Sequence, residues 1–467
     1  MAFQSINPAT EEVEATFNEH TTDQVEEALA EVSQAFERWR KTPMAERSRL
    51  MQAACGYLRA NKARFAGLMT AEMGKPIRQA EAEVEKCALC CEFYAERAAE
   101  FLGDRETSSS AARSYVAFDP LGPVLAVMPW NFPFWQVFRF AAPALMAGNT
   151  GVLKHSANVP RCALAIEEVF REAGFPPGVF RTLLISSKRV AGVIEDGRIR
   201  AVTLTGSDIA GAKVAEVSGR ALKKTVLELG GSDAFIILAD ADLEAATTTA
   251  VNARYQNAGQ SCIAAKRFIV VEEVADEFIA RFSDAAKQLR VGDPAEPETE
   301  LGPVARDDLR DTLEDQVQRS LAEGAVLVAG GHRLDRRGYF YAPTVLSNVS
   351  PAMAVFTEET FGPVAAIVRA RDTENAIALA NQSQYGLGAA LWTRDVEAGS
   401  RWAREIDAGA VFINGMVASD PRLPFGGVKR SGYGRELGEY GIREFMNIKT
   451  VWIGPARTEA AVLPAAE

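Results

Sequence analysis

Histidine and cysteine are scarce in this sequence, and long hydrophobic runs are missing from it. The 467 residues include 3 histidines and 6 cysteines. So few histidines disfavour zinc-dependent and histidine-based catalysis, and the cysteines are too few to form a disulfide framework. No run of about 18 apolar residues occurs, and the first residues lack the basic and apolar segments of a signal peptide. We therefore expect free thiols, no membrane span and a location in the cytoplasm.

An excess of positive charge is also lacking. Lysine and arginine number 51 against 62 aspartates and glutamates, for a formal net charge of -11. This balance argues against a nucleic-acid partner held by general electrostatics. With 48% hydrophobic residues, the chain has the composition of a globular protein, and its length predicts two or three domains.

Three of the cysteines, Cys87, Cys90 and Cys91, have a spacing that could chelate zinc. Residues 84–98 have the pattern of a helix, however, and no histidine or second cysteine pair accompanies them. We expect no metal site.

The chain is predicted to open with helices. Thr21 and Gln24 form a plausible capping box, and apolar residues follow at helical spacing, so an amphipathic helix is expected to open the protein. Further helices are expected at 44–61, 64–73 and 78–102. Residues 113–118 have the pattern of a strand in a protruding hairpin.

From residue 121 onward, short β-rich apolar runs alternate with helix-length stretches. The runs are 124–128, 151–153, 179–185, 201–204 and 225–227. This alternation predicts repeated βαβ units, and hence an α/β fold with a mostly parallel sheet. Later strands at 234–238, 267–271, 325–328, 364–368 and 408–413, separated by helices, predict a second α/β domain.

Polar and charged residues follow several of these strands. Asn131, Lys154, Ser207 and Glu228 each come shortly after an apolar run. The carboxyl ends of parallel strands meet at one edge of a sheet, where ligands bind. The turn from Thr205 to Gly211 could place backbone N–H groups against a phosphate.

Cys262 is the candidate nucleophile. It lies in a small, polar, glycine-containing loop, Tyr255 to Cys262, and Glu228 ends an apolar run upstream. A thiol with an ordinary pKa of about 8.5 is mostly protonated at neutral pH, so it needs a base or a favourable field. The sequence therefore predicts a thiol nucleophile with a nearby carboxylate base.

Five segments in this order resemble the NAD(P)-dependent aldehyde dehydrogenase superfamily, and the resemblance spans nearly the whole chain. They are Pro129-Trp130-Asn131-Phe132-Pro133, Leu227-Glu228-Leu229-Gly230-Gly231, Asn257-Ala258-Gly259-Gln260-Ser261-Cys262, Glu359-Thr360-Phe361-Gly362-Pro363 and Pro424-Phe425-Gly426-Gly427. The length and the segment Leu153-Lys154-His155-Ser156 are most similar to the short bacterial succinate-semialdehyde dehydrogenases.

The resemblance implies a role for each matching residue. Cys262 would attack an aldehyde, Asn131 and the Cys262 N–H would hold the oxyanion, and Glu228 would activate the water that hydrolyses the thioester. The positions expected to contact the cofactor are Pro129, Trp130, Lys154, Thr205, Gly206, Ser207, Leu229, Glu359 and Phe361. The resemblance also implies a Rossmann-like dinucleotide-binding domain (1–104 and 121–232), a catalytic domain (233–440) and a small β oligomerisation element (105–120 and 441–467). A homodimer or homotetramer is expected on the same ground.

A carboxylated substrate is expected from the segment after Asn131. Phe132, Trp135 and Arg139 would share one stripe of a helix that has Pro133 in its first turn. A guanidinium in an apolar helix is costly to bury without an anion, and it pairs well with a carboxylate. Arg139 and Ser419 match substrate-carboxylate positions of the succinate-semialdehyde enzymes. The alternatives are that Arg139 pairs with a Glu or Asp of the protein itself, or that it reaches solvent.

Three positions depart from relatives. Gln256 stands where larger relatives carry a second carboxylate-binding Arg, so the substrate grip is weaker or built differently. Ala264 removes a second cysteine near the nucleophile, so no local disulfide switch is expected. Ala157 replaces a Glu that would repel a 2′-phosphate, and we therefore expect NADP to be accepted, and even preferred, alongside NAD.

Other functions stay open from the sequence. Within the same chemistry, the substrate could be glutarate semialdehyde or a broad range of aldehydes, whereas a CoA-acylating reaction is disfavoured because Glu228 is kept. A non-catalytic protein on the same fold is a further alternative, although it would have no need of both Cys262 and Glu228.

Overall fold

The computed structural model describes residues 2–455 and contains two large, mostly parallel sheets. The first sheet has six strands in the order β19-β9-β8-β5-β6-β7. Its strands are β5 (Pro123–Met128), β6 (Thr150–His155), β7 (Phe180–Thr182), β8 (Ala201–Thr205), β9 (Lys224–Glu228) and β19 (Gly432–Tyr433). Only β19 runs antiparallel to its neighbour.

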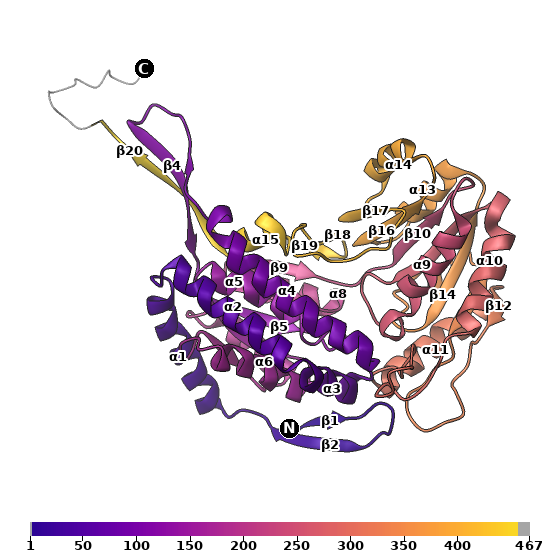
Figure 1. Cartoon of the computed structure of the whole chain (residues 1–467), viewed down its shortest axis with the longest axis horizontal. Coiled ribbons are helices and arrows are strands. Elements are labelled where there is room, and N and C mark those ends of the chain that lie inside the picture. Colours follow the sequence, from indigo (N-terminus) through magenta and orange to yellow (C-terminus); the bar gives the residue numbers. More distant parts are fainter. Residues whose placement is uncertain (1, 456–467) are drawn as a thin grey trace.

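Helices cover both faces of this first sheet (Figure 1). They are α1 (Thr22–Trp39), α2 (Met44–Ala60), α3 (Lys62–Met73), α4 (Ile77–Phe101), α5 (Trp135–Met146), α6 (Pro160–Glu172), α7 (Val190–Glu195) and α8 (Asp208–Arg220), with a 3₁₀ turn η1 (Ser187–Arg189). Successive residues of β5 point to opposite faces, as a pleated strand requires. Val124 and Ala126 pack into the core formed with α2 to α6, whereas Leu125 packs with α1, α7 and α8.

The second sheet has seven strands in the order β12-β13-β14-β11-β10-β16-β17, and only β12 is antiparallel. Its strands are β10 (Asp233–Ile237), β11 (Ala265–Val271), β12 (Val326–Ala329), β13 (Thr344–Ser347), β14 (Val364–Ala370), β16 (Gly388–Trp392) and β17 (Ala410–Ile413). The accompanying helices are α9 (Leu243–Tyr255), α10 (Glu272–Lys287), α11 (Asp307–Ala322), α12 (Ala354–Thr357), α13 (Thr373–Asn381) and α14 (Val396–Trp402), with 3₁₀ turns η2 (Gln256–Gly259) and η3 (Ala403–Glu405). The α/β fold class predicted from the sequence is confirmed.

A third, small sheet projects from the body as an arm (Figure 1). It consists of β3 (Arg105–Glu106), β4 (Arg113–Pro120) and β20 (Met446–Ile453), in the order β20-β4-β3. A short helix α15 (Gly438–Arg443) precedes β20, and β15 (Tyr385–Gly386) pairs with β18 (Val428–Lys429) near the second sheet. Within residues 2–455, every helix is too short or too polar to span a lipid bilayer.

The secondary structure differs from the sequence-based expectation in three respects. A β-hairpin of β1 (Ala2–Ile6) and β2 (Val13–Asn18), rather than a helix, opens the chain. Strands β13 and β16 of the second sheet were not predicted, nor were the two-residue strands β15, β18 and β19, and β16 lies inside the second sheet between β10 and β17. Helix α5 begins at Trp135, so Phe132 and Pro133 precede it instead of forming its first turn.

The parallel register of the first sheet brings its strand ends together. Val127 pairs with Lys154, and Thr205 pairs with Glu228. The residues that follow β5, β6, β8 and β9 therefore lie along one edge, as the alternation of strands and helices predicts.

Candidate active site

The loop that carries Cys262 has a left-handed backbone. Asn257, Ala258 and Gly259 have φ angles of 55°, 52° and 72°. For an alanine this conformation costs about 1–2 kcal/mol, so other contacts must hold it. The N–H of Gln260 donates to the carbonyl of Asn257 at 3.0 Å, and the Asn257 N–H donates to the side chain of Gln79 at 2.7 Å.

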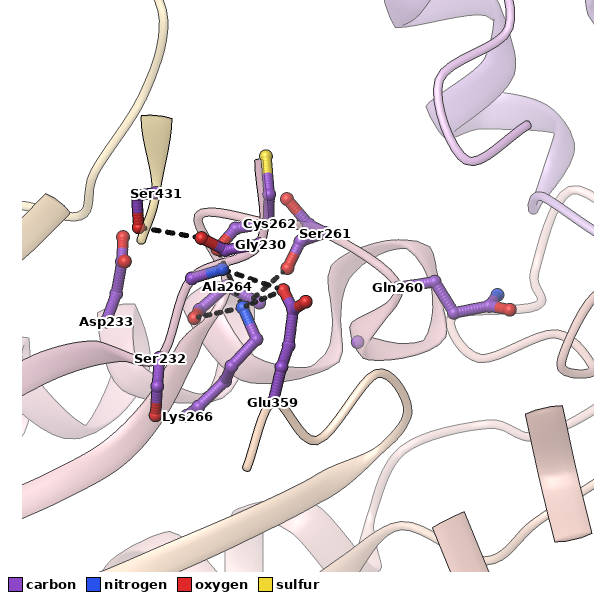
Figure 2. Close-up of polar contacts among 12 residues, drawn as sticks. Gly230, Ser232, Asp233, Gln260, Ser261, Cys262, Ala264, Lys266, Glu359 and Ser431 are labelled. Atoms are coloured by element: carbon purple, nitrogen blue, oxygen red, sulfur yellow. Dashed lines mark hydrogen bonds and ion pairs between the residues drawn. The ribbon is translucent and has the colours of Figure 1, made fainter. Parts of the chain in front are cut away.

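Two buried cations fix this loop through its carbonyl groups. Arg254, on α9, donates to the carbonyls of Gly259 at 2.7 Å and Ala265 at 3.1 Å. Lys266, on β11, donates to the carbonyls of Ser261 at 2.8 Å and Cys262 at 2.7 Å (Figure 2). Both side chains are fully buried, so the cations stabilise the loop where water cannot.

The sulfur of Cys262 points away from Lys266 and Glu359 (Figure 2), and Cys262 lines two cavities. One has a volume of about 190 Å³ and is mostly apolar. The other is a groove of about 400 Å³. A single nucleophile therefore faces both spaces.

Asn131 lines the groove and is held in one orientation. Its Nδ2 donates to the carbonyl of Gln260 at 3.0 Å, and its Oδ1 accepts from Gln136 at 3.0 Å. The second Nδ2 hydrogen is left for a ligand. The backbone N–H of Cys262 has no acceptor among residues 2–455. Asn131 and Cys262 thus supply two donors of the kind that hold an oxyanion.

Glu228 is placed differently from the other two predicted catalytic residues, because its side chain lines neither cavity. It is 2% exposed, and both carboxylate oxygens lack a hydrogen-bond partner within residues 2–455. Burial, and then the charge of Glu436, raise its pKa well above the ordinary range. In this conformation burial therefore favours the protonated form of Glu228.

The Cys262 thiol is also neutral at rest. Burial raises its pKa to about 12, although the positive charges of Arg139 and Lys266 oppose this effect. Activation of the sulfur consequently needs proton removal by a base when substrate and cofactor are bound.

All nine residues expected to contact a cofactor line the groove, together with Asn131. Lys154 is buried, and no carboxylate of residues 2–455 lies within ion-pair distance of it. Ser207 caps helix α8, its hydroxyl accepting from the N–H of Ala210 at 3.2 Å. Glu359 accepts from the N–H of Gly231 at 3.0 Å and lies 3.5 Å from Lys266. A cation and a helix N-terminus in one groove fit the phosphates of a dinucleotide.

All five residues expected to bind substrate, namely Phe132, Trp135, Arg139, Gln256 and Ser419, line the cavity of about 190 Å³. The guanidinium of Arg139, however, forms an ion pair with Glu436 and donates to Thr205 at 3.2 Å. It also stacks on Phe425, 4.7 Å from the ring centre. Of the arrangements considered from the sequence, the one in which Arg139 pairs with a carboxylate of the protein is the one observed.

The sequence reasoning missed several residues of the site. Lys86 lines the apolar cavity with Met416 and Phe425, and Ser156, Arg306 and Gln136 line the groove. For Lys86 a signal was present, because Glu83 and Cys90 lie three and four residues away on the same helical face and both are buried.

Metal ligands do not come together in the described part of the chain. Cys87, Cys90 and Cys91 are fully buried thiols on α4. No group of three or more His, Cys, Asp or Glu side chains within residues 2–455 is arranged to hold a metal ion.

The sequence and the fold are similar to those of characterised enzymes. A "Probable succinate-semialdehyde dehydrogenase [NADP(+)]" of Synechocystis sp. is 53% identical over 453 residues, which cover 97% of this chain and 100% of that protein. "Succinate-semialdehyde dehydrogenase [NADP(+)] 1" of Mycobacterium tuberculosis is 51% identical over 456 residues, again 97% and 100% of the two chains. The crystal structure of succinic semialdehyde dehydrogenase from Streptococcus pyogenes in complex with NADP+ superimposes with a TM-score of 0.95 at 39% identity, covering 97% of this chain and 100% of that one.

The characteristic sequence pattern of the Aldehyde dehydrogenase family matches residues 1–451. That match includes the nucleophile loop, the Asn131 segment and both cavities described above. The chain therefore belongs to the aldehyde dehydrogenase family.

Proposed function

We propose that this protein oxidises succinate semialdehyde, or a close ω-carboxy aldehyde, to the acid while reducing NADP+. Two relatives that are 53% and 51% identical carry this activity and cofactor in their names. The observation that carries the proposal is the position of Cys262, which borders a cavity of about 190 Å³ on one side and a groove of about 400 Å³ that contains all nine expected cofactor residues on the other.

The groove fits a dinucleotide phosphate because it contains the unpaired cation of Lys154 and the N-terminus of α8. When bound, NADP+ accepts the hydride that leaves the substrate carbon. Ala157 carries no carboxylate to repel a 2′-phosphate, which supports acceptance of NADP, with NAD as a second cofactor.

The residues around the sulfur divide the reaction between them. A base removes the proton of the Cys262 thiol and passes it to solvent, and the resulting thiolate attacks the aldehyde carbon. The developing oxyanion accepts hydrogen bonds from Asn131 Nδ2 and the Cys262 N–H. After hydride loss the substrate is a thioester on Cys262. Glu228 then removes a proton from the water that hydrolyses this thioester.

This last step requires Glu228 to leave its resting place. General-base catalysis needs a hydrogen bond to the water, directly or through one other water, but Glu228 lines neither cavity. Neither of its oxygens has a hydrogen-bond partner among the described residues 2–455, so rotation toward Cys262 breaks no hydrogen bond there. We propose that this rotation precedes hydrolysis.

In the acyl cavity, we propose that Phe132, Trp135 and Gln256 shape the space around the substrate and that Ser419 donates to its carboxylate. Arg139 contributes through its field, because its charge lowers the pKa of Cys262 even though Glu436 is its ion-pair partner.

We also propose the division into domains and the assembly given by the sequence. The dinucleotide-binding domain is 1–104 with 121–232, the catalytic domain is 233–440, and the oligomerisation element is 105–120 with 441–467, of which 456–467 lie outside the described residues. The arm supports a homodimer or a homotetramer, because β20 is an edge strand that exposes Ile448 and Trp452 and such an edge tends to pair with another chain. Six free thiols support a reducing compartment, the cytoplasm.

The test is an aldehyde panel with the purified protein, NADP+ and NAD+. Succinate semialdehyde, glutarate semialdehyde and butanal are compared by the absorbance of the reduced nicotinamide, and Cys262→Ala serves as the inactive control. We expect the highest kcat/KM with succinate semialdehyde. A preference for butanal would refute the substrate, and an NAD preference above about 100-fold, or roughly 2.7 kcal/mol, would refute the cofactor.

A further inference from the structure

Lys86 is a cation in the acyl cavity that the reaction described above does not use. It lies on α4, half-buried, and lines the same cavity as Cys262. Its Nζ donates to Ser419 Oγ at 2.8 Å and lies 4.3 Å from the ring centre of Trp135.

The hydrogen bonds around Ser419 leave donors free for a ligand. Ser419 Oγ accepts from Lys86 and, at 2.9 Å, from the indole N–H of Trp135. A hydroxyl that accepts twice still has its own O–H to donate, and an ammonium has three donors, of which Lys86 uses one within residues 2–455. An acceptor in the cavity could therefore bind both side chains at once.

The other cations near this cavity are already neutralised. Arg139 is paired with Glu436, and Lys75, which packs on Phe132, is paired with Glu83. By contrast, no carboxylate of residues 2–455 lies within 4.0 Å of the Lys86 ammonium. A half-buried charge without a counter-ion is unfavourable until an anion arrives.

We propose that Lys86 is the specificity-determining cation that binds the distal carboxylate of the substrate, with the Ser419 hydroxyl as the second donor. This inference rests on the proposed function and sharpens it, because it moves the carboxylate-binding charge from Arg139 on α5 to Lys86 on α4.

Titration of Lys86 gives the proposal a pH signature. Burial, and then the charge of Arg139, lower its pKa to about 8, while the nearby groups Cys87, Glu83 and Cys90 oppose the shift. Asp420, in the facing segment, also interacts with its charge. The ammonium is present below this pKa and is lost above it, so kcat/KM for a carboxylated aldehyde should fall above pH of about 8 relative to that for an uncharged one.

The experiment compares Lys86→Met, Lys86→Gln and Lys86→Arg with the wild type on succinate semialdehyde and on butanal, the uncharged aldehyde of the same chain length. Lys41→Met, at an exposed position, is the matched control. For Lys86→Met and Lys86→Gln we expect kcat/KM for succinate semialdehyde to fall by about 10- to 150-fold, mainly through KM, as for the loss of one hydrogen bond to a charged group. Butanal oxidation should fall by a much smaller factor, so that the ratio of the two kcat/KM values drops, and Lys86→Arg should retain the carboxylate preference to higher pH.

A binding measurement keeps the proposal testable if a variant turns over poorly. Succinate should raise the Tm of the wild type and of Lys86→Arg, but not that of Lys86→Met or Lys86→Gln. An equal loss on both aldehydes, or an unchanged preference for succinate semialdehyde, would overturn the role of Lys86. The proposed function is judged separately by the wild type alone, which must prefer succinate semialdehyde over butanal.

Discussion

The loop around Cys262 and the end of strand β9 are both buried, but they differ in hydrogen bonding. Backbone carbonyl groups of the loop have partners, whereas the carboxylate at the end of β9 has none within residues 2–455. Arg254 and Lys266 donate to backbone carbonyls of the loop. Glu228 has no hydrogen-bond partner for either oxygen within residues 2–455. A buried polar group without a partner costs about 1–3 kcal/mol. The loop is thus built to stay in place, whereas the resting position of Glu228 is only loosely favoured.

The residues around Glu228 leave space for its carboxyl group at the end of β9. A Cβ on Gly426 would lie 2.7 Å from Glu228 Oε1, so only glycine leaves room for this carboxyl group. Glu436 is its charged neighbour, and burial raises the pKa of both groups. Two adjacent buried carboxyls favour protonation.

The largest expected effect comes from replacing Glu228, the loosely held residue of the two regions compared. Replacing Glu228 by Gln should lower kcat by about 10²- to 10⁴-fold, the usual contribution of a general base, while the Tm at neutral pH stays equal or rises. If Glu228 acts only on water, the first turnover should still give a burst of reduced nicotinamide. Stopped-flow absorbance and thermal melts measure the two results.

Glu436→Gln is the matched control for Glu228→Gln. It removes the partner of Arg139, and breaking a buried ion pair typically costs about 3–5 kcal/mol. A large loss of stability in Glu228→Gln, equal to that of Glu436→Gln, would contradict the contrast between the two carboxyls.

In the loop around Cys262, removing a buried cation should lower the stability of the folded protein and not only its catalytic rate. Lys266→Met leaves the carbonyls of Ser261 and Cys262 and the carboxylate of Glu359 without their partner. We expect a loss of about 3–5 kcal/mol of unfolding free energy, measured by chemical denaturation, with Lys41→Met near the wild type. A Tm equal to the control's would show that the loop needs no cation.

Asn131 is also firmly held, by Gln136 and the Gln260 carbonyl, and its proposed role is to donate to the oxyanion. Asn131→Ala removes one oxyanion donor, for which we expect kcat to fall by about 10²- to 10³-fold. Gln136 loses its acceptor, and the Gln260 carbonyl keeps the donor Asn257 but loses Asn131, so a modest fall in Tm should accompany the change. Gln136→Ala, which removes the Asn131 support but not the donor, should slow the enzyme less, and an equal effect would assign Asn131 a purely structural role.

Sequence patterns predicted which strand ends lie side by side better than they predicted the side-chain contacts made at those ends. The parallel pairing of Thr205 with Glu228 follows from alternating strands and helices, because βαβ units leave little freedom. The partner of Arg139 did not follow, because Glu436 is 297 residues away in the chain and approaches only through β19, which pairs with β9. An ion pair between residues so far apart in the chain leaves no periodic pattern in the sequence from which it could be predicted.

The same limit explains the missed strands and Lys86. β16 is short and contains Gly388, Ala389 and Ala390, whose weak β propensity hides a strand that tertiary packing imposes. The loop backbone also escaped prediction, since the contacts that accompany the positive φ angles of Asn257 and Ala258 come from Gln79, which bonds Asn257, and from Arg254 and Lys266, which bond Gly259 and Ser261. Lys86 shares a helical face with Glu83 and Cys90, but its partners Ser419 and Trp135 come from distant segments of the chain.

The smallest expected effect is a pH dependence of stability. The pKa of Glu228 is raised in the folded state, so between the unfolded-state pKa, about 4.3 for a glutamate, and the higher folded-state pKa, folding takes up a proton that the unfolded chain has released. Stability from this group is complete below the unfolded pKa and is lost as pH rises toward the folded one, by at most about 1.4 kcal/mol per pH unit. Asp233, with a pKa raised to about 7 by burial, adds a loss of the same sign in both wild type and variant. Denaturation series from about pH 6 to 9 should therefore show a shallower decline for Glu228→Gln than for the wild type, and parallel curves would mean that Glu228 is already ionised in its resting place.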